Sequence, residues 1–471
     1  MSTTTQRAAR GTPSRYAAPP MSAPPRWGER LRPPIALAAA ASVLAVLILW
    51  LHGGNLGTLT SGGTGFAMAS GRLTGLVAAD LLLIQVLLMA RIPWVERAYG
   101  QDQLARWHRL VGFTSFNLML AHVVLITIGY AATDRNGLIS EAWNLITTYP
   151  GMLLATAGTA ALILVVATSI RAARRKLRYE SWHLLHLYAY AGVGLALPHQ
   201  IWTGQDFVLT APARAYWWTL WIGAAGSILI FRLGVPIWRS VRHDLRVVKV
   251  VREAPGVTSV YLRGRDLERL RVQAGQFFMW RFLAGPGWMR AHPYSLSAAP
   301  RSHQLRITVK DLGDGSAQIS RLKKGTRAII EGPYGRLTGE ARRSHRITLI
   351  ACGIGITPLR ALLESEYYRP GEASLLYRAS EPADFAFYNE IEAIARARGV
   401  AVHYLSGPRG HTGWLPVGYP NGPALLAHLV PNIDEGDVFV CGPQAWMDDV
   451  VISLDLVGVP TEHIHLEKFS W

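Results

Sequence analysis

Two histidines in one apolar stretch are the first residues of this chain whose spacing suits a chemical role. His108 and His122 lie fourteen positions apart within residues 107–130, a stretch apolar enough to cross a bilayer. An α-helix rises about 21 Å over that spacing and returns to within roughly 40° of its starting face. One helix would therefore present two imidazoles on one side, at two depths of a membrane.

A second apolar stretch, residues 182–202, repeats this arrangement with His186 and His199. Their separation along a helix axis is about 20 Å. Two helices with matching histidine layers predict two haems, each held by one histidine from each helix. The alternative interpretation is that these histidines are hydrogen-bonded core residues.

The second pair has a less regular spacing than the first. Thirteen residues on a straight helix leave His186 and His199 about 140° apart. Irregularity at Gly192, Gly194 and Pro198 would re-aim one of the two rings. His183 is an alternative ligand, although its sixteen-residue gap to His199 fits neither the face nor the depth better.

Six apolar stretches are long enough to span a bilayer, and the histidine pairs lie in the third and fifth of them. The six are residues 35–52, 73–89, 107–130, 151–170, 182–202 and 216–233. Half of the 471 residues are hydrophobic and only 17% are charged. The chain is therefore expected to be a multi-pass protein of the plasma membrane, with a lipid bilayer around its first half.

The placement of the basic residues orients the expected spans. The net charge is +17, but the charge concentrates in the N-terminal tail and in short loops between spans two and three and between spans four and five. The first outer loop, residues 53–71, carries no charge at all. This pattern follows the positive-inside rule and predicts that both termini are cytoplasmic. It argues against a nucleic-acid partner.

Two polar residues interrupt the second span. Asp80 lies near its middle, where a carboxylate is costly, and is interpreted as a protonated or hydrogen-bonded structural group. Arg72 opens the span at the outer face. It is either an interfacial anchor or a partner for a haem propionate or for the electron acceptor.

The composition changes after Arg242 to short β-type runs and then to alternating strands and helices. The expected fold is a six-helix membrane bundle, followed by a β-barrel domain and an α/β domain with a parallel sheet. The expected boundaries are a disordered basic tail over 1–32, a membrane domain over 33–240, a barrel over 243–341 and an α/β domain over 344–471. The two cysteines are too few for an iron–sulfur cluster held by four thiolates.

Two motifs in the expected barrel suit a flavin. HPYSLSAAP, residues 292–300, offers hydroxyl groups and an aromatic ring for stacking and hydrogen bonds along one edge of a flat cofactor. DGSAQI, residues 314–319, is expected to start a helix with Gly315 and Ser316. Free backbone N–H groups at such a start can hold a pyrophosphate.

Two further motifs follow strands of the expected α/β domain. ACGIGITP, residues 351–358, follows an apolar strand and opens a helix, which is a second phosphate site by the same physics, although a tight turn is the alternative. VFVCGPQAWM, residues 438–447, places Cys441 at the end of another strand of the sheet. There a thiol could approach a nicotinamide ring.

Taken together and in this order, these features resemble the ferric reductase and NADPH oxidase superfamily over residues 35–471. The resemblance rests on the histidine spacings of fourteen and thirteen, on HPYSL, GPYG, GIGITP and CGP, and on the terminal aromatic in EKFSW. It implies that FAD is contacted by His292, Pro293, Tyr294, Ser295, Gly315 and Ser316. It also implies that the nicotinamide dinucleotide is bound by Gly353, Gly355, Thr357 and Pro358, with Cys441, Gly442 and Pro443 at the hydride-transfer end. It places Arg72 near the outer haem.

The resemblance favours NADPH over NADH. The strand LLYRAS ends with Arg378 and Ser380, where this superfamily often binds the 2′-phosphate, and arginine can grip a phosphate through two parallel hydrogen bonds. The alternative is a surface arginine paired with Glu381 or Asp384. The resemblance also implies that Trp471 stacks on the flavin and moves aside for hydride transfer; the alternative is that it packs against the last helix.

The resulting expectation is an NAD(P)H-dependent enzyme that passes electrons through FAD and two b-type haems to dioxygen or to a ferric or cupric complex outside. Animal oxidases of the superfamily carry another histidine where this chain has Ile126, which weakens the case for dioxygen. The alternative is a membrane electron carrier that serves a partner protein or a quinone.

Overall fold

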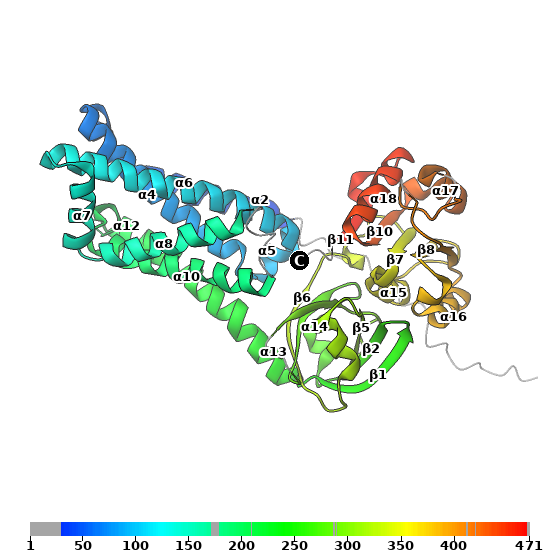
Figure 1. Cartoon of the computed structure of the whole chain (residues 1–471). Helices are drawn as coiled ribbons and strands as arrows, with labels where there is room; N and C mark the ends of the chain where they lie inside the picture. Colours follow the sequence, from blue (N-terminus) through cyan, green and yellow to red (C-terminus); the bar gives the residue numbers. More distant parts are fainter. Residues whose placement is uncertain are drawn as a thin grey trace, which may run out of the picture. The chain divides into compact units, whose positions relative to one another are not determined.

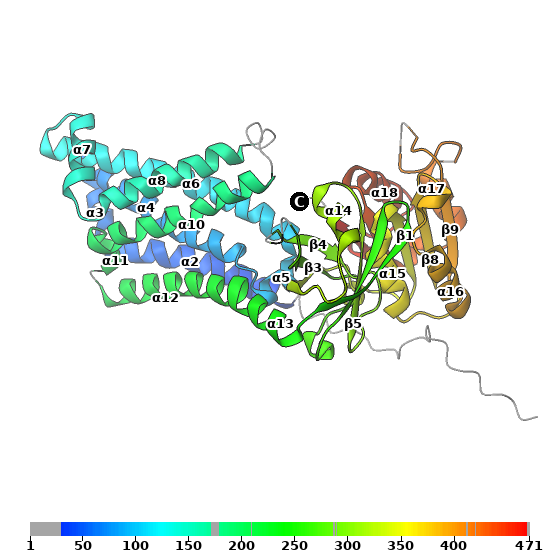
Figure 2. The same ribbon diagram turned by 60° about the horizontal axis from the view of Figure 1, so that its bottom comes forward.

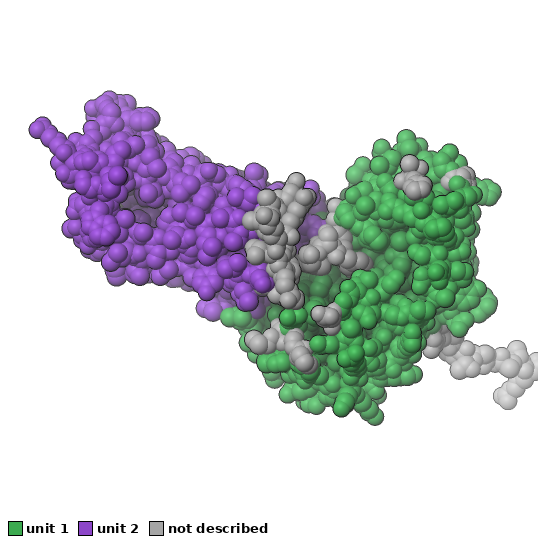
Figure 3. Space-filling view, viewed as in Figure 1, with its two compact units in different colours: residues 1–27, 233–471 green, residues 28–232 purple. Residues whose placement is uncertain are grey.

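The structure is a computed structural model, which describes residues 30–170, 179–208, 210–285, 288, 290–410, 413–419 and 421–468. Nearly all of the expected N-terminal tail, the basic residues 171–178 and Trp471 lie outside the described residues. The chain divides into two compact units, one of residues 28–232 and one that includes residues 233–471 (Figure 3).

The first unit is helical (Figures 1 and 2). Its described helices are α2 (Arg32–His52), α3 (Asn55–Thr60), α4 (Gly63–Leu88), α5 (Pro93–Tyr99), α6 (Gln101–Asp134), α7 (Leu138–Thr148), α8 (Met152–Ser169), α10 (Tyr179–Trp202), α11 (Gln205–Val208) and α12 (Ala211–Ser227). Helix α12 continues through a π-helical turn, η1 (Ile228–Gly234), into α13 (Val235–His243). The histidine stretches fall on α6 and α10.

Five of the described helices are long and apolar enough to cross a membrane. They are Arg32–His52, Gly63–Leu88, Gln101–Asp134, Met152–Ser169 and Ala211–His243. Helix α10 spans 24 residues but is not one of the five, because its histidines, tyrosines and proline dilute its apolar residues. The chain is a multi-pass membrane protein, and the sixth span remains a prediction.

Two close helix pairs build this unit, α4 against α6 and α8 against α10 (Figures 1 and 2). Glycine makes the second approach possible, because a Cβ added at Gly158 would lie 2.6 Å from the carbonyl oxygen of Gly192. Small residues of this kind let helix backbones pack closely in membranes.

The second unit begins with two antiparallel sheets of three strands. One has the order β1 (Arg246–Ala254), β2 (Val257–Arg263) and β5 (Gln304–Lys310), and the other β4 (His292–Ser295), β3 (Phe277–Phe282) and β6 (Ala328–Tyr334). Their inner faces share one apolar core, to which Val260, Ile307 and Trp280 belong. Closure into the expected barrel remains a prediction. Short helical turns lie between the strands: η2 (Leu267–Leu270), α14 (Asp314–Ala317), η3 (Gln318–Arg321) and η4 (Gly339–Ala341).

A parallel five-stranded sheet follows, as the sequence predicts. Its order is β11 (Ile464–Lys468), β10 (Asp437–Gly442), β7 (Ile347–Cys352), β8 (Ala373–Ala379) and β9 (Ala401–Ser406). The helices are α15 (Ile356–Ser365), α16 (Tyr388–Arg398), α17 (Gly422–Leu429) and α18 (Gln444–Leu456), with short turns η5 (Gly353–Gly355), η6 (Pro382–Asp384), η7 (Ile433–Glu435) and η8 (Thr461–His463).

Alternation along the strands sends side chains to two separate cores. Leu349 and Ala351 of β7 pack with α15 and α16, whereas Ile350 and Cys352 pack with α17 and α18. Successive side chains of a strand point to opposite faces, which explains this division. The dinucleotide motif lies where β7 ends and α15 begins, at the carboxyl edge of the sheet.

Candidate functional site

Helices α6 and α10 bring the four histidines together as two pairs. The ring centroids of His108 and His186 lie 6.0 Å apart, with the ring planes at 59°. Those of His122 and His199 lie 6.2 Å apart, with the planes at 29°. The two pairs are the ones that the sequence predicts, although the second spacing is thirteen rather than fourteen. Pro198 lies inside α10, directly before the second histidine of that helix.

Backbone carbonyls of α4 hold the two rings of α6. The Nδ1 of His122 lies 2.7 Å from the carbonyl oxygen of Gly71, and the Nδ1 of His108 lies 3.3 Å from that of Gln85. A carbonyl oxygen only accepts, so in each ring Nδ1 carries the proton and Nε2 keeps a free lone pair. Metal-binding histidines typically have this arrangement.

The rings of α10 have different surroundings. The Nδ1 of His186 lies 3.4 Å from the hydroxyl of Ser169. The Nδ1 of His199 is buried and has no hydrogen-bond partner among the described residues. Both rings are therefore held less firmly by the protein than the rings of α6.

Glycines of α4 make room for the outer ring of α6. A Cβ added at Gly75 would lie 2.4 Å from the Nδ1 of His122, and one added at Gly71 would lie 3.0 Å from the side chain of Ile126. Real Cβ atoms do not approach this closely, so a larger residue at Gly75 would displace the imidazole.

The two polar residues of the second span both have partners. Asp80 is fully buried, and its Oδ1 accepts hydrogen bonds from Ser42 and Tyr216, each at 2.7 Å. These contacts agree with the structural role expected for this carboxyl group. Arg72 donates to Asn55 at 3.4 Å.

The residues expected to hold a flavin lie on and beside β4. The rings of His292 and Tyr294 are stacked, with centroids 6.0 Å apart and planes at 20°. A Cβ added at Gly315 would lie 2.6 Å from the His292 ring. The lack of a side chain at Gly315 therefore allows the His292 ring to pack against this turn. Burial raises the pKa of Tyr294. The hydroxyl of Ser295 is buried and has no hydrogen-bond partner within the described parts of the chain.

The helix start expected at DGSAQI is a single turn, α14. The N–H of Ser316 donates to the carbonyl oxygen of Gly313 at 3.0 Å, and the hydroxyl of Ser316 accepts from the N–H of Leu312 at 2.8 Å. These bonds leave the backbone of the turn with fewer free donors than the sequence suggests. The contact of Gly315 and Ser316 with a pyrophosphate remains a prediction.

A cavity of about 480 Å³ lies at the carboxyl edge of the parallel sheet. It collects six residues expected at the nucleotide site, namely Gly353, Gly355, Arg378, Ser380, Gly442 and Pro443. Thr357 and Pro358 are instead buried in the first turn of α15. The loop packs tightly against the end of β10, because a Cβ added at Gly355 would lie 2.1 Å from the carbonyl oxygen of Cys441.

The two thiols of the sheet occupy different environments. Cys441 is fully buried with its side chain in the core against α15, and burial raises the pKa of its thiol. Cys352 on the neighbouring strand lines the cavity. Burial also raises the pKa of Cys352, and the nearby guanidinium of Arg378 opposes this effect. In the described structure the cavity therefore meets the thiol of Cys352, which the sequence did not single out.

Arg378 is the main cation of the cavity. It is 6% exposed and donates to the carbonyl oxygen of Gly407 at 3.2 Å and to the sulfur of Cys352 at 3.8 Å. Among the described residues it has no carboxylate partner, so the ion pairs with Glu381 and Asp384 that the alternative requires are not formed.

Sequence reasoning missed several residues that line the cavity. They are Val257, Lys310, Leu312, Ile354, Tyr377, Ala379, Ala386 and Gln444. Asp384 also lines the cavity, but the sequence offered it only as an ion-pair partner of Arg378. Gln444 follows CGP directly and was within reach of the motif argument. Lys310 and Leu312 come from the flavin-side sheet region and reach the cavity only through folding of the chain.

Family comparisons agree with both halves of this description. A family described as ferric reductase like transmembrane component matches residues 74–197, which include three of the four histidines. A family described as oxidoreductase NAD-binding domain matches residues 349–451, which include the cavity motifs. The chain is an oxidoreductase with a ferric-reductase-like transmembrane region.

The soluble half of this oxidoreductase is similar to several reductases and flavohemoproteins. It is 28% identical over 241 residues to ferredoxin–NADP reductase B of Sorangium cellulosum, covering 48% of this chain and 97% of that protein. It is 26% identical over 246 residues to a flavohemoprotein of Oceanobacillus iheyensis, covering 50% and 60%. It is also 26% identical over 243 residues to a glycine betaine monooxygenase reductase subunit of Chromohalobacter salexigens, covering 50% and 66%. The matched part of the chain thus covers less than two thirds of the length of the last two relatives.

A solved FAD/NAD-binding domain of nitric oxide dioxygenase from Vibrio cholerae is similar, with 24% identity and a TM-score of 0.40 over 48% of this chain and 99% of that one. The chain therefore has a ferric-reductase-like transmembrane region followed by FAD- and NAD(P)-binding domains similar to those of ferredoxin reductases.

Proposed function

We propose that this oxidoreductase passes electrons from cytoplasmic NADPH, through FAD and two b-type haems, to an acceptor at the outer face of the plasma membrane. The observation that carries the proposal is the pairing of His108 with His186 and of His122 with His199. When bound, FAD converts the two-electron chemistry of nicotinamide into the one-electron chemistry of haem.

The spacing of the rings in each histidine pair would leave room for one metal ion between them. An imidazole nitrogen binds a metal at about 2 Å and lies roughly 1.1 Å from the centre of its ring, so two opposed imidazoles have centroids about 6 Å apart. The observed separations are 6.0 and 6.2 Å. Two side chains suffice here because a porphyrin supplies the remaining ligands, and the described residues contain no cluster of three metal-binding side chains.

The buried polar groups fit the same use. The carbonyl oxygens of Gly71 and Gln85 fix the protonated nitrogen of the rings on α6, so those rings are oriented before a metal arrives. This preorganisation supports His108 and His122 as the firmer ligand of each pair.

The nucleotide cavity supports NADPH as the donor. Arg378 is a buried guanidinium with no described carboxylate partner, and it lines a cavity that also contains Ser380. A phosphate in the cavity would supply the missing negative charge through charge-assisted hydrogen bonds. A Cβ added at Gly353 would have nothing within 4 Å, so this glycine leaves space for a dinucleotide to approach the backbone, whereas Gly355 packs against the carbonyl oxygen of Cys441.

The charge pattern supports an orientation in which the nucleotide binds on the cytoplasmic side and the electron acceptor binds at the outer face. Arg97, Arg106 and Arg109 flank the end of the membrane unit where α5 meets α6, whereas residues 53–71 carry no charge. Basic residues remain on the cytoplasmic side, which places His122 and His199 at the outer depth. The acceptors that suit this arrangement are dioxygen, giving superoxide, and ferric or cupric complexes.

Haem content tests the membrane half of the proposal. Purified full-length protein should contain two haems per chain in a pyridine haemochrome assay, and one haem or none would overturn the two-haem arrangement. His108→Ala should abolish transmembrane electron flow, whereas His122→Ala should leave NADPH-dependent reduction of the inner haem. His52→Ala, at an exposed position of α2, is the control and should retain both haems.

Anaerobic reduction tests the direction and the acceptor. NADPH should reduce the flavin and then the haems, and dioxygen and ferric citrate should be added separately to the reduced protein. Fast reoxidation by either one identifies the acceptor class. Slow reoxidation by both, with rapid reoxidation by a quinone, would favour the electron carrier over the reductase.

A further inference from the structure

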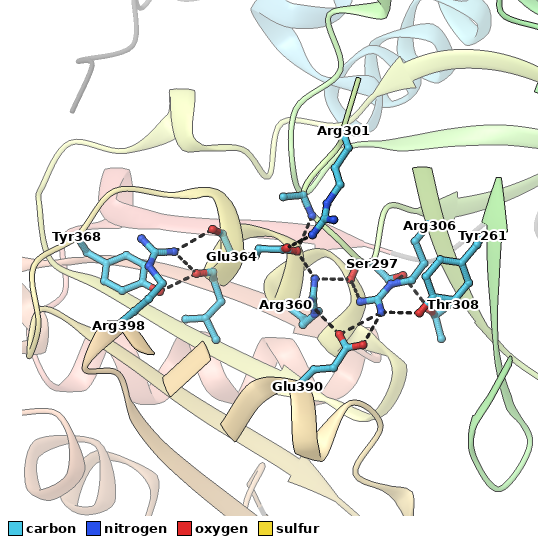
Figure 4. A network of polar contacts seen from close by, with 12 residues as sticks. Tyr261, Ser297, Arg301, Arg306, Thr308, Arg360, Glu364, Tyr368, Glu390 and Arg398 are labelled. Carbon is cyan, nitrogen blue, oxygen red and sulfur yellow. Dashed lines mark hydrogen bonds and ion pairs between the residues drawn. The ribbon is translucent and has the colours of Figure 1, made fainter. Parts of the chain in front are cut away.

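An ion-pair network whose central arginines are buried joins the flavin-side sheets to the nucleotide domain (Figure 4). We call it the interdomain network, and its members are Arg301, Arg306, Arg360, Glu364 and Glu390. The first two belong to the flavin side, at and before β5, while the others lie on α15 and α16 of the nucleotide side.

Arg306 makes the largest set of contacts. Its Nη1 donates to both carboxylate oxygens of Glu390, at 2.9 and 3.0 Å. Its Nε donates to the Ser297 hydroxyl at 3.1 Å and its Nη2 to the Ser297 carbonyl oxygen at 2.6 Å. The guanidinium also lies 4.7 Å from the centre of the Phe387 ring. One side chain of β5 thus holds both the nucleotide-side helix α16 and the segment that follows β4.

Two residues one helical turn apart on α15 hold the same segment from the other side. Arg360 donates to the carbonyl oxygen of Ser297 at 3.2 Å and pairs with Glu390 at 2.8 Å. Glu364 accepts the backbone N–H of Ala299 at 2.9 Å and pairs with Arg360.

These contacts link a segment beside the expected flavin site to a helix beside the expected nucleotide site. Ser297 and Ala299 belong to HPYSLSAAP and come directly after β4, the strand expected to contact the flavin. Arg360 and Glu364 lie on α15, whose first turn follows the dinucleotide loop at Gly353–Gly355. The interdomain network therefore connects the exit of the flavin strand to the helix that begins at the nucleotide loop.

Stability alone is a weak explanation for such a cluster. Arg306 and Arg360 are 4% and 2% exposed, and removing ions from water costs about as much as their pairing returns, so apolar replacements of buried ion pairs are often neutral or stabilising. Directional contacts of this kind are better at fixing one arrangement of the parts that they join.

We propose that the interdomain network positions the flavin-binding strand against the dinucleotide loop, and that Arg306, Glu390 and Arg360 are positioning residues for hydride transfer. The proposal rests on the nicotinamide–flavin reaction of the proposed function. In that reaction a C–H bond of the dihydronicotinamide breaks, its hydride forms an N–H bond on the flavin, and a solvent proton completes the reduced flavin. Misplacement of reacting groups by about 1 Å can slow such a step by about 100-fold.

The test is stopped-flow reduction of the flavin by NADPH in the full-length holoprotein, under anaerobic conditions. Glu390→Gln should lower the rate of flavin reduction by roughly 10- to 100-fold and should raise the primary isotope effect with NADPH deuterated at the transferred position. The affinity for NADPH should change less than the rate. An unchanged rate and isotope effect would overturn the proposal, and so would a loss confined to nucleotide affinity.

Two further variants separate positioning from folding. Arg360→Lys keeps the charge, but its single ammonium group cannot donate to Ser297, Glu364 and Glu390 together. It should therefore show the same raised isotope effect as Glu390→Gln. Its flavin content and melting temperature should stay close to those of the native protein. Arg306→Gln combined with Glu390→Gln should slow flavin reduction by less than the product of the two single effects, because the two variants share one contact. Additive losses would contradict a shared network.

The matched control is Glu435→Gln, which removes a carboxylate from an exposed ion pair with Arg346 and should leave the rate unchanged. Failure of the proposed function would appear differently. Native protein whose flavin is reduced by dithionite but by neither NADPH nor NADH would refute the nicotinamide reaction itself, whereas native reduction with an unaffected Glu390→Gln variant would refute the positioning role alone.

Discussion

The imidazole rings of His122 and His199 lie 6.2 Å apart, one from α6 and one from α10, with their planes at 29°. The first ring is fixed through its Nδ1 by the carbonyl oxygen of Gly71, 2.7 Å away. The second ring has no such partner among the described residues. In the outer pair, the hydrogen bond from His122 to α4 therefore fixes the orientation of its ring, whereas the orientation of the His199 ring is less constrained.

Gly75→Ala should perturb the outer haem without touching a ligand. The added Cβ would lie 2.4 Å from the Nδ1 of His122, so the ring must move away from its carbonyl partner. We expect the outer haem to be lost or to become high-spin, while NADPH still reduces the inner haem. Optical spectra and haem content of the purified protein measure this.

The control for that variant is Gly223→Ala on α12, where an added Cβ has nothing within 4 Å. Alanine favours a helix over glycine by about 1 kcal/mol, so both variants share that gain and only the steric clash separates them. Native spectra in Gly75→Ala would show that His122 does not occupy the position described.

Arg378→Ala should weaken the preference for NADPH over NADH. Hydrogen bonds to charged groups contribute about 1.5–3 kcal/mol, so kcat/KM for NADPH should fall by roughly 10- to 100-fold. The value for NADH should change little, because it lacks the 2′-phosphate. Arg346→Ala, which removes an exposed arginine of the same domain, is the control. Equal losses for both nucleotides would assign Arg378 to the fold or to the pyrophosphate instead.

The histidine pairs could be predicted from sequence because helical periodicity fixes depth and face over short spacings. The spacing of His186 and His199 on a straight helix argued against the second pair, yet both rings reach their partners on α6. The supporting carbonyls of Gly71 and Gln85 could not be predicted, since they depend on which face of α4 packs against α6.

Strand order made it predictable that the glycine motif, Arg378 and the CGP motif lie close together, because the carboxyl ends of β7, β8 and β10 meet at one edge of a parallel sheet. The prediction for Cys441 did not take into account that successive side chains of a strand point to opposite faces of the sheet. Cys441 and Cys352 lie on neighbouring strands and point to opposite faces. The interdomain network was out of reach altogether, because Arg306 and Glu390 are 84 positions apart and no motif joins them.

Asp80→Asn should be tolerated and Asp80→Leu should not. Asparagine keeps an oxygen that accepts from Ser42 and Tyr216, which fasten α2 and α12 to α4. Leucine removes the acceptor that both hydroxyls share and leaves them only their contacts with each other and with the carbonyl oxygen of Ser42. Each lost hydrogen bond costs about 0.5–1.5 kcal/mol. The melting temperature of the full-length protein in detergent should fall only for Asp80→Leu. An equal fall for both variants would mean that the carboxylate itself is required.

The last prediction concerns Asp437, a fully buried carboxyl group at the start of β10. Its Oδ2 accepts the N–H groups of Arg343 and Ser344 at 2.7 and 2.6 Å, and its Oδ1 lies 2.8 Å from the Nε2 of His465 on β11. Burial alone would raise the pKa of Asp437, but the hydrogen bonds from His465, Ser344 and Arg343 outweigh it and hold the pKa below its ordinary value.

A carboxyl group whose pKa is lower in the folded than in the unfolded state stabilises the fold above its unfolded pKa, which is about 3.9. That contribution is lost as the pH falls through the folded pKa. Asp437→Asn should therefore lower the stability of the nucleotide domain at pH 7 by about 1.5–3 kcal/mol. The difference in stability between Asp437→Asn and the native protein should become smaller only below about pH 4.

Thermal unfolding followed by flavin release, between pH 3 and pH 8, measures the difference between the two proteins. Groups that titrate in both proteins cancel in this comparison. Asp434→Asn, at an exposed position three residues earlier, should track the native protein throughout. A difference that narrowed already between pH 5 and pH 7 would show that a group other than the Asp437 carboxyl controls the attachment of β11.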